Sequence, residues 1–285
     1  MRKYLYILLF LVALIIPRAD AVALSDSDGN LDIKSFAKEL NISPTIVGED
    51  DRQEITNENA QDLEKAVVIL GRSSHNKIHP ICSGAMVGPN LVLTAAHCLV
   101  ENRKYKNNIE VFAVVADKSD NEPLLSAKSI ELYVPKEYIE LSHNPDSTSD
   151  KYDYGVIVLD KPIALKTGWF RLKDRPTPYL KIITMGHPKD KPDDTLWRSE
   201  GSTGFWVDDN NTFYHNADIL PGNSGGPIVM KKKPDEIIGI HIAHNGVDDY
   251  APDGYPNVGL KITQEIVDLV QTYNRRTGPY LTPKN

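Results

Sequence analysis

Short runs of β-branched and aromatic residues fill the chain from about residue 66 onward, and they constrain its fold more than any other feature. Valine, isoleucine, tyrosine and threonine favour strands, and the glycine, proline, asparagine and aspartate between the runs favour turns. About a dozen such runs with no long helix between them indicate an all-β barrel or sandwich. The predicted strands cover residues 66–70, 82–87, 91–94, 109–116, 130–134, 154–159, 180–185, 197–206, 212–214, 227–230, 237–242 and 256–262.

One helix is predicted after the last strand, over about residues 264–276. Thr263 can cap it, because a threonine hydroxyl accepts a hydrogen bond from a backbone N–H in the first helical turn. Apolar residues recur at helical spacing, which predicts that one face packs against the strands. These residues are Ile266, Leu269, Val270 and Tyr273.

The N-terminus has the pattern of an export signal. A short basic start precedes an apolar run over residues 4–16, and small residues follow that permit cleavage after Ala21 or Ala23. This run is shorter than the about 20 apolar residues that a membrane-spanning helix needs, which favours a cleaved signal. An uncleaved N-terminal anchor is the alternative. Residues 24–44 are polar and charged, as in a pro-segment or a disordered tail. We therefore expect a secreted, extracellular protein, with the periplasm as the other destination.

Charge and cysteine content narrow the class further. The formal net charge of -7 argues against nucleic acid or an anionic membrane as the main partner. Cys82 and Cys98 are the only cysteines, and in an oxidising compartment such a pair is more often bridged than free. A bridge would be worth about 3 kcal/mol in the chain-entropy account. Two buried free thiols are the alternative.

Three short motifs hold the chemistry. Small residues and then His97 end an apolar strand in LTAAHC, and Asp153 stands at the mouth of the apolar strand in DYGVIVL. Taken alone, the histidine suits a structural imidazole and the aspartate a strand-end cap. In LPGNSGGP, glycines flank Ser224, and they let the backbone aim two N–H groups at one point.

Together these residue types suit peptide-bond hydrolysis. A serine hydroxyl is a weak nucleophile until a base takes its proton. A neutral imidazole can take that proton and later give it to the leaving amine, while a buried carboxylate fixes the tautomer of the ring. Backbone N–H groups then stabilise the oxyanion that forms.

The three motifs resemble the signatures of chymotrypsin-like serine proteases, and they occur in that family's order of His, Asp and Ser. The resemblance implies two orthogonal six-stranded antiparallel β-barrels, over about residues 60–162 and 179–262, with the active site between them. It also implies the family's well-characterised mechanism of serine protease catalysis. In that mechanism Ser224 is the nucleophile, His97 the general base and acid, and Asp153 the orienting carboxylate. Gly222 and Ser224 supply the oxyanion N–H groups.

The same resemblance places Cys82 and Cys98 where the family has the disulfide beside its histidine. It implies no metal ion and no organic cofactor, and the other histidines lack ligand spacing. The expected partners are protein or peptide substrates, and we expect a monomer. An inactive protease-fold binding module is the rival from another functional class, although an inactive copy has no chemical need for all three triad residues.

A narrower resemblance is to the bacterial glutamyl endopeptidases. Residues 46–52 (IVGEDDR) are similar to the start of mature enzymes on that branch, so we expect the protease domain to span residues 45–285. Residues 185–192 (MGHPKDKP) resemble another segment of the branch. Asn223 stands where trypsin-like animal enzymes have aspartate, so a freed N-terminus cannot form their activating ion pair at this position.

The glutamyl resemblance implies a specificity pocket. His241 resembles the pocket histidine, and an imidazole can bind a substrate carboxylate, which predicts cleavage after glutamate and aspartate. Two residues argue otherwise. Ile219 occupies the position of the branch's pocket hydroxyl, and Asp218 falls where trypsin keeps the aspartate that binds lysine or arginine. Trypsin-like or broad specificity is therefore the alternative.

The substrate-binding strand is also expected by resemblance. An extended peptide can pair with the edge of a strand through main-chain hydrogen bonds, whatever its side chains. The residues expected to bind it in this way are Ile242, Ala243 and His244.

Overall fold

The computed structural model describes residues 46–61, 63–75, 77–115, 125–142, 149–207, 211–244 and 254–277. The chain divides into two units, residues 1–44 and 45–285, and every described residue belongs to the second. The predicted signal peptide and pro-segment lie outside the described residues, so both stay predictions.

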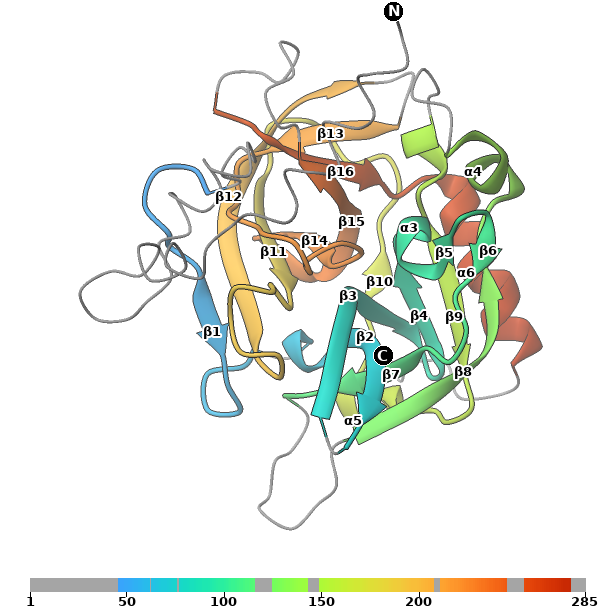
Figure 1. Cartoon of the computed structure of the whole chain (residues 1–285). Helices are drawn as coiled ribbons and strands as arrows, with labels where there is room; N and C mark the ends of the chain where they lie inside the picture. Colours follow the sequence, from blue (N-terminus) through green and yellow to red (C-terminus); the bar gives the residue numbers. More distant parts are fainter. Residues whose placement is uncertain are drawn as a thin grey trace, which may run out of the picture. The chain divides into compact units, whose positions relative to one another are not determined.

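Six antiparallel strands close the first barrel, in the order β2-β3-β4-β9-β8-β7 (Figure 1). Strands β4 and β9 are buried along their whole length, which explains why they occur in the sequence as unbroken apolar runs. The six strands are β2 (Val67–Ser74), β3 (Lys77–Gly88), β4 (Leu91–Thr94), β7 (Glu110–Ala113), β8 (Leu125–Tyr133) and β9 (Gly155–Leu159).

A second ring of six antiparallel strands runs β11-β12-β13-β16-β15-β14 and closes where β14 pairs with β11. Two short strands extend it: β1 (Gln53–Ile55) pairs with β12, and β10 (Arg171–Leu172) pairs in parallel with β15. The ring consists of β11 (Lys181–Gly186), β12 (Leu196–Val207), β13 (Thr212–His215), β14 (Pro227–Met230), β15 (Lys233–His244) and β16 (Asn257–Lys261).

Helix α6 (Gln264–Arg276) follows the last strand, as predicted. The Thr263 hydroxyl accepts a hydrogen bond from the N–H of Ile266 at 3.4 Å, which confirms the cap. Ile266, Val270 and Tyr273 are buried, so the predicted apolar face packs against the barrels. Two closed six-stranded barrels and this helix confirm the predicted fold class.

The strand ends and the shortest elements differ from the sequence prediction. Strands β3, β8 and β15 begin earlier than predicted, and the first residues of β3 are exposed or half-buried, so they lack an apolar signal. One or two turns of helix are too short to show periodicity. The elements that the sequence does not predict are α3 (Ala96–Leu99), α4 (Lys136–Leu141), α5 (Ala164–Thr167), the 3-10 turns η3 (Glu64–Ala66) and η4 (Ser149–Tyr152), the short strands β1 and β10, and the ribbon of β5 (Val100–Glu101) and β6 (Lys104–Tyr105).

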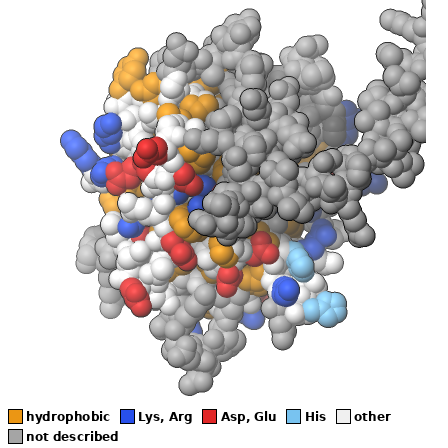
Figure 2. Space-filling model, turned by 60° about the vertical axis from the view of Figure 1, so that its left-hand side comes forward, with side chains coloured by type: hydrophobic (Ala, Val, Ile, Leu, Met, Phe, Trp, Pro, Cys, Tyr) orange, Lys and Arg blue, Asp and Glu red, His pale blue; other side chains and the backbone are white. Residues whose placement is uncertain are grey.

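The main hydrophobic core takes side chains from both barrels and from α6, which fixes the loops of one barrel against those of the other. A smaller cluster around Phe213 fills the inside of the second barrel. No helix in the described ranges is long and apolar enough to cross a membrane. On the face shown in Figure 2, acidic side chains lie among basic ones, so neither sign covers it alone.

Candidate active site

Strand pairing brings His97 and Asp153 together. Strand β4 pairs with β9 so that Thr94 lies opposite Gly155, which places the residues just after β4 beside those just before β9. One carboxylate oxygen of Asp153 accepts the backbone N–H of His97 at 2.9 Å, and the other lies 2.8 Å from His97 Nδ1. The carboxylate therefore holds both the backbone and the ring of the histidine.

The electrostatics of this pair suit a base. Asp153 is buried, while the His97 side chain remains one-third exposed, at 33%. Burial favours the neutral ring, but the charge and the hydrogen bond of Asp153 outweigh burial and raise the pKa of His97 above its ordinary value. The ring nitrogen that does not face Asp153 is left to exchange a proton with a substrate or a nucleophile.

Ser224 lies in the tight loop between β13 and β14. Two glycines in this loop adopt left-handed backbone conformations, Gly222 with φ of 106° and Gly225 with φ of 79°. A side chain on Gly225 would collide with the Thr94 hydroxyl of the first barrel. The glycines that the sequence places around the serine are therefore required both by the turn and by close packing.

Ser83 on β3 ties this loop to the first barrel. Its N–H donates to the Ser224 carbonyl oxygen at 2.8 Å, and its hydroxyl donates to the Gly222 carbonyl oxygen at 2.8 Å. The same hydroxyl accepts the N–H of His187 at 2.9 Å. Sequence reasoning missed Ser83, because its place directly after Cys82 does not by itself indicate these contacts.

Two backbone donors remain available in the serine loop. Within the described residues, neither the N–H of Gly222 nor the N–H of Ser224 donates a hydrogen bond to a protein acceptor. The Ser224 hydroxyl likewise has no hydrogen-bond partner there, so the histidine and the serine are brought near one another without a direct bond between them. Catalytic hydrogen bonds are often loose before a substrate binds.

Cys82 and Cys98 form the predicted disulfide, with Cα atoms 5.9 Å apart. The Cys98 sulfur lies 3.6 Å from the Ser224 carbonyl oxygen, so the bridge packs under both the histidine and the serine. Ligand-type atoms of the two cysteines and His97 lie within 4.8 Å of one another. The two sulfurs are bonded to each other, however, and provide no thiolate for a metal ion.

The carboxylate of Asp218 accepts hydrogen bonds from the protein's own backbone. It accepts the N–H of Val47 at 2.7 Å and the N–H of Asp51 at 3.3 Å. Burial raises the pKa of Asp218, although these two hydrogen bonds oppose the shift. A substrate side chain would have to compete with this segment for the carboxylate. Sequence reasoning gave Asp218 a place among the substrate-binding residues and did not anticipate these partners.

The other predicted pocket residues lie on neighbouring elements. Ile219 is buried at 1% exposure, so it adds apolar surface where the branch has a hydroxyl. His241 on β15 is buried and meets His215 edge to face, with ring centroids 5.8 Å apart. Both ring nitrogens of His215 are buried without a hydrogen-bond partner among the described residues, and burial lowers the pKa of His215 to about 3. His215 is therefore neutral at physiological pH.

The end of β15 carries the predicted substrate-binding residues. Ile242 is buried and Ala243 is half-buried, and Ala243 lies opposite Val258 of β16. His244 belongs to the strand and lies opposite Asn257, while its side chain is outside what the structure describes. The strand lies next to the serine loop, because the N–H of Gly225 donates to the His241 carbonyl oxygen at 2.7 Å.

A second missed feature lies in the segment that precedes β1. The guanidinium of Arg52, only 1% exposed, pairs with Asp50 at 2.8 Å and with Asp190 at 2.6 Å. Arg52 and its hydrogen bond lower the pKa of Asp50 to about 2, against the smaller effect of burial. Asp190 follows Lys189, whose N–H donates to the Pro221 carbonyl oxygen at 2.8 Å. Arg52 is thus linked to the serine loop through one short segment.

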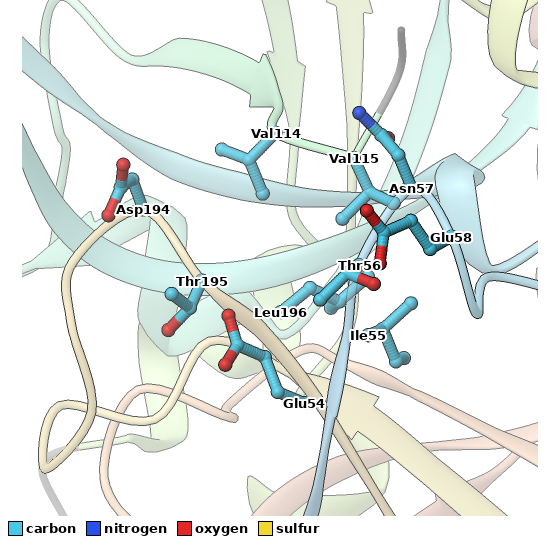
Figure 3. A pocket seen from close by; sticks show the side chains of 10 residues that line it. All are labelled: Glu54, Ile55, Thr56, Asn57, Glu58, Val114, Val115, Asp194, Thr195 and Leu196. Atoms are coloured by element: carbon cyan, nitrogen blue, oxygen red, sulfur yellow. The ribbon is translucent and has the colours of Figure 1, made fainter. Parts of the chain in front are cut away.

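A separate cavity of about 290 Å³ lies beside β1 (Figure 3). Its lining includes the carboxylates of Glu54, Glu58 and Asp194 together with apolar groups such as Val114. No predicted triad or pocket residue lines it. This cavity is therefore distinct from the groups that sequence analysis assigns to catalysis.

The chain is similar in sequence to known proteins. The chain matches the trypsin family over residues 55–268. A glutamyl endopeptidase of Bacillus licheniformis is 28% identical over 246 residues, which cover 82% of this chain and 71% of that protein. A Bacillus subtilis protein named extracellular metalloprotease is 23% identical over 230 residues, 80% of this chain and 69% of that protein. Rat serine protease 23 is 26% identical over 220 residues, 67% of this chain and 55% of that protein.

A solved structure of a Glu endopeptidase in complex with MPD has the same fold. Its TM-score is 0.63 at 24% identity, and the alignment covers 81% of this chain and 99% of that chain. The family match extends from β1 into α6, so it includes both barrels and all three motifs. This chain belongs to the trypsin family of serine endopeptidases, and within it the chain is similar to the glutamyl endopeptidases described above.

Proposed function

We propose that the protein hydrolyses peptide bonds through an acyl-enzyme formed on Ser224. The observation that carries this proposal is the two-point contact between Asp153 and His97. His97 takes the hydroxyl proton as Ser224 attacks the substrate carbonyl. It then gives that proton to the leaving amine. Water hydrolyses the acyl-enzyme in the same way: His97 takes a proton from the water and returns it to the Ser224 oxygen as the acid product leaves.

The carboxylate of Asp153 supports both steps. It keeps the proton of the neutral ring on Nδ1, so the other nitrogen is a base, and it stabilises the imidazolium that forms. The raised pKa of His97 has this same cause. The unoccupied N–H groups of Gly222 and Ser224 support a role as donors to the oxyanion, and loss of one such donor costs about 2.7–4 kcal/mol in a studied protease.

Replacement of Ser224 tests the mechanism. Ser224→Ala should reduce kcat by orders of magnitude, because the nucleophile is removed while the fold remains. Ser126→Ala, at a half-exposed serine on β8, is the matched control and should keep wild-type activity. A correctly folded Ser224→Ala protein that cleaves peptides at the wild-type rate would exclude this mechanism. The rival, an inactive binding module, predicts no cleavage by the wild-type protein either.

We propose that cleavage follows acidic residues, with Glu preferred over Asp. The support is the position of His241 beside the serine loop and the similarity to a glutamyl endopeptidase. The engagement of Asp218 by Val47 and Asp51 weakens the trypsin-like alternative, because that carboxylate already has donors. Broad specificity remains the second candidate, since buried Ile219 adds apolar surface at this place.

Matched peptides that differ only in the residue before the scissile bond test the specificity. Glu should be cleaved faster than Gln, Lys or Leu. Equal rates of cleavage after Glu and Gln would show that no positively charged group binds the substrate carboxylate. Faster cleavage after Lys, abolished by Asp218→Ser, would establish the trypsin-like alternative instead.

We also propose export with removal of residues 1–21 or 1–23, and a mature enzyme that begins near Thr45 or Ile46. The support is the composition of residues 1–44 and the engagement of Val47 just beyond this point. N-terminal sequencing of active material from the culture medium measures it directly. An active form that retains residues 24–44 would show that this segment does not inhibit.

A further inference from the structure

Three cationic side chains border the proposed active site. Arg72 lies on β2, Lys106 follows β6, and Lys189 lies in the loop after β11. The ammonium of Lys106 donates a hydrogen bond to the His97 carbonyl oxygen at 3.2 Å. Arg72 donates to the carbonyl oxygen of Asn107 at 3.4 Å, so its guanidinium lies beside Lys106.

Lys189 approaches the same place from the second barrel. A Cβ atom built on Gly222 would lie 3.2 Å from Lys189 Cγ, so the stem of this lysine covers the glycine of the proposed oxyanion hole. Burial lowers the pKa of Lys106, Glu101 opposes that shift, and the charges of Arg72 and Lys189 add to it. The three cations therefore share one neighbourhood.

In the described part of the chain this cationic cluster forms no close ion pair, and Glu101 is the carboxylate whose charge acts on Lys106 from a longer distance. Among the described residues, no carboxylate lies within 4.0 Å of the charged nitrogens of Arg72, Lys106 or Lys189. Other cations of the protein, such as Arg52 and Arg198, have carboxylate partners at 2.6–2.8 Å. In a chain with 39 acidic and 32 basic residues, three neighbouring cations without a close ion pair beside the proposed reaction centre favour an anionic ligand.

The serine loop separates this cluster from the predicted substrate strand. On one side the N–H of Gly225 donates to the His241 carbonyl oxygen at 2.7 Å, beside the strand that would bind the residues before the scissile bond. On the other side the Ser224 carbonyl oxygen lies 3.6 Å from the disulfide sulfur of Cys98. The leaving amine must face His97 to receive its proton. The residues after the scissile bond therefore pass over the disulfide, between Lys106 and Lys189.

We propose that Arg72, Lys106 and Lys189 select substrates with acidic residues in the two or three positions after the scissile bond. This inference rests on the proposed function and adds a second determinant of specificity to it. The chemical class of substrate is thus an acidic peptide segment that follows the cleaved bond. Acidic side chains there complete ion pairs that the folded chain leaves open, and lysines there meet like charge.

The expected size follows from exposed ion pairs, each of which changes binding by a factor of about 1.5–5. Two or three such pairs predict about a tenfold preference for Glu-Glu over Gln-Gln after the scissile bond, and a larger one over Lys-Lys. Salt screens exposed charges over about 10 Å at 0.1 M and about 3 Å at 1 M. The preference should therefore shrink toward one in 1 M NaCl.

The test uses active enzyme from the full chain and three internally quenched peptides. They share one acyl half and differ only by Glu-Glu, Gln-Gln or Lys-Lys after the bond. The readout is the ratio of kcat/KM values, which does not depend on the amount of active enzyme. The triple variant Arg72→Gln, Lys106→Gln and Lys189→Gln should bring the ratio of Glu-Glu to Lys-Lys near one.

The matched control removes three other exposed cations. Lys161→Gln, Lys173→Gln and Arg175→Gln cause the same change of net charge in the segment around β10, and none of these residues contacts a proposed triad residue. This variant should retain the wild-type ratio. A wild-type ratio near one at low salt, or a ratio lost equally in both variants, would overturn the proposal.

Labelling by a serine-directed fluorophosphonate separates this inference from the proposed function. If the enzyme is labelled and active but shows no preference for acidic residues, only the proposed role of the cationic cluster is refuted. Absence of both labelling and cleavage would instead refute the proposed function, and the selection of acidic substrates with it.

Discussion

Replacement of Arg52 by methionine should both destabilise the protein and slow catalysis. Arg52 is far from the triad in sequence, but its buried guanidinium bonds to Asp50 and Asp190 through distances of 2.6–2.9 Å. Methionine keeps much of the side-chain volume and removes the charge. The two carboxylates are then left without their main partner, although Lys191 still lies 3.5 Å from Asp50.

The magnitude follows from the exposure of the carboxylates. Removal of one partner from a buried pair costs about 3–5 kcal/mol. Asp50 is 37% exposed and Asp190 is 13% exposed, so water can solvate the first carboxylate better than the second. We therefore expect a loss of about 3 kcal/mol in the free energy of unfolding, at the lower end of that range. Urea denaturation at neutral pH measures it.

The catalytic effect follows from the link to the serine loop. Asp190 adjoins Lys189, whose N–H holds the Pro221 carbonyl oxygen, and Pro221 precedes Gly222. A looser segment would displace the proposed oxyanion donor of Gly222 without removing it. We expect kcat to fall about tenfold, less than the 10²–10³ that loss of one donor costs. KM should change little, because the binding strand is on another element.

Arg198→Met is the matched control. Arg198 pairs with Glu64 at 2.8 Å, with side chains only 16% and 8% exposed, and this pair has no contact with the serine loop. It should lose comparable stability and keep its kcat at temperatures where it is folded. Equal kcat values for Arg52→Met and Arg198→Met would refute the link between Arg52 and the serine loop. Unchanged stability in Arg52→Met would refute the energetic argument as well.

Three further predictions concern the bridge and the histidines. Replacement of Cys82 and Cys98 by alanine should cost about 2–5 kcal/mol of stability and should reduce activity, as measured by denaturation and peptide cleavage; unchanged values would contradict a bracing role. The proposed mechanism requires neutral His97 for activity, so the acid limb of kcat/KM should lie above pH 6.5, and Asp153→Asn should move it down. An acid limb below pH 6.5 would contradict the raised pKa. His215 has a folded pKa of about 3 and an ordinary unfolded value of 6.5, so the unfolded state binds one more proton between them. Stability should therefore fall as pH falls through that window, and His215→Phe should flatten the slope by about 1.4 kcal/mol per pH unit; an unchanged slope would show that His215 does not contribute.

Sequence reasoning succeeded where the signal is local. The triad motifs are short and contain residue types with few other reasons to occur together, and β4 and β9 are unbroken apolar runs. The pairing of these two strands then brings His97 and Asp153 together, although they are 56 residues apart. The order of the motifs identifies the fold, and the fold supplies the geometry.

Contacts between segments far apart in the sequence could not be predicted in this way. Asp218 receives the N–H of Val47 across 171 residues, and Arg52 meets Asp190 across 138. No local pattern marks a carboxylate that binds backbone from another segment. Ser83 illustrates the same limit, because a serine on a strand has no signature that separates a bridge between barrels from a surface hydroxyl.

Active-site labelling measures directly whether Ser224 is the nucleophile. The purified, active enzyme is treated with a fluorophosphonate, and the adduct is located by mass spectrometry of proteolytic fragments. We expect one adduct per chain, on Ser224, and loss of labelling in His97→Ala, because only a serine with its base is nucleophilic. An adduct on another residue, or labelling of Ser224 that persists in His97→Ala, would contradict the proposed mechanism.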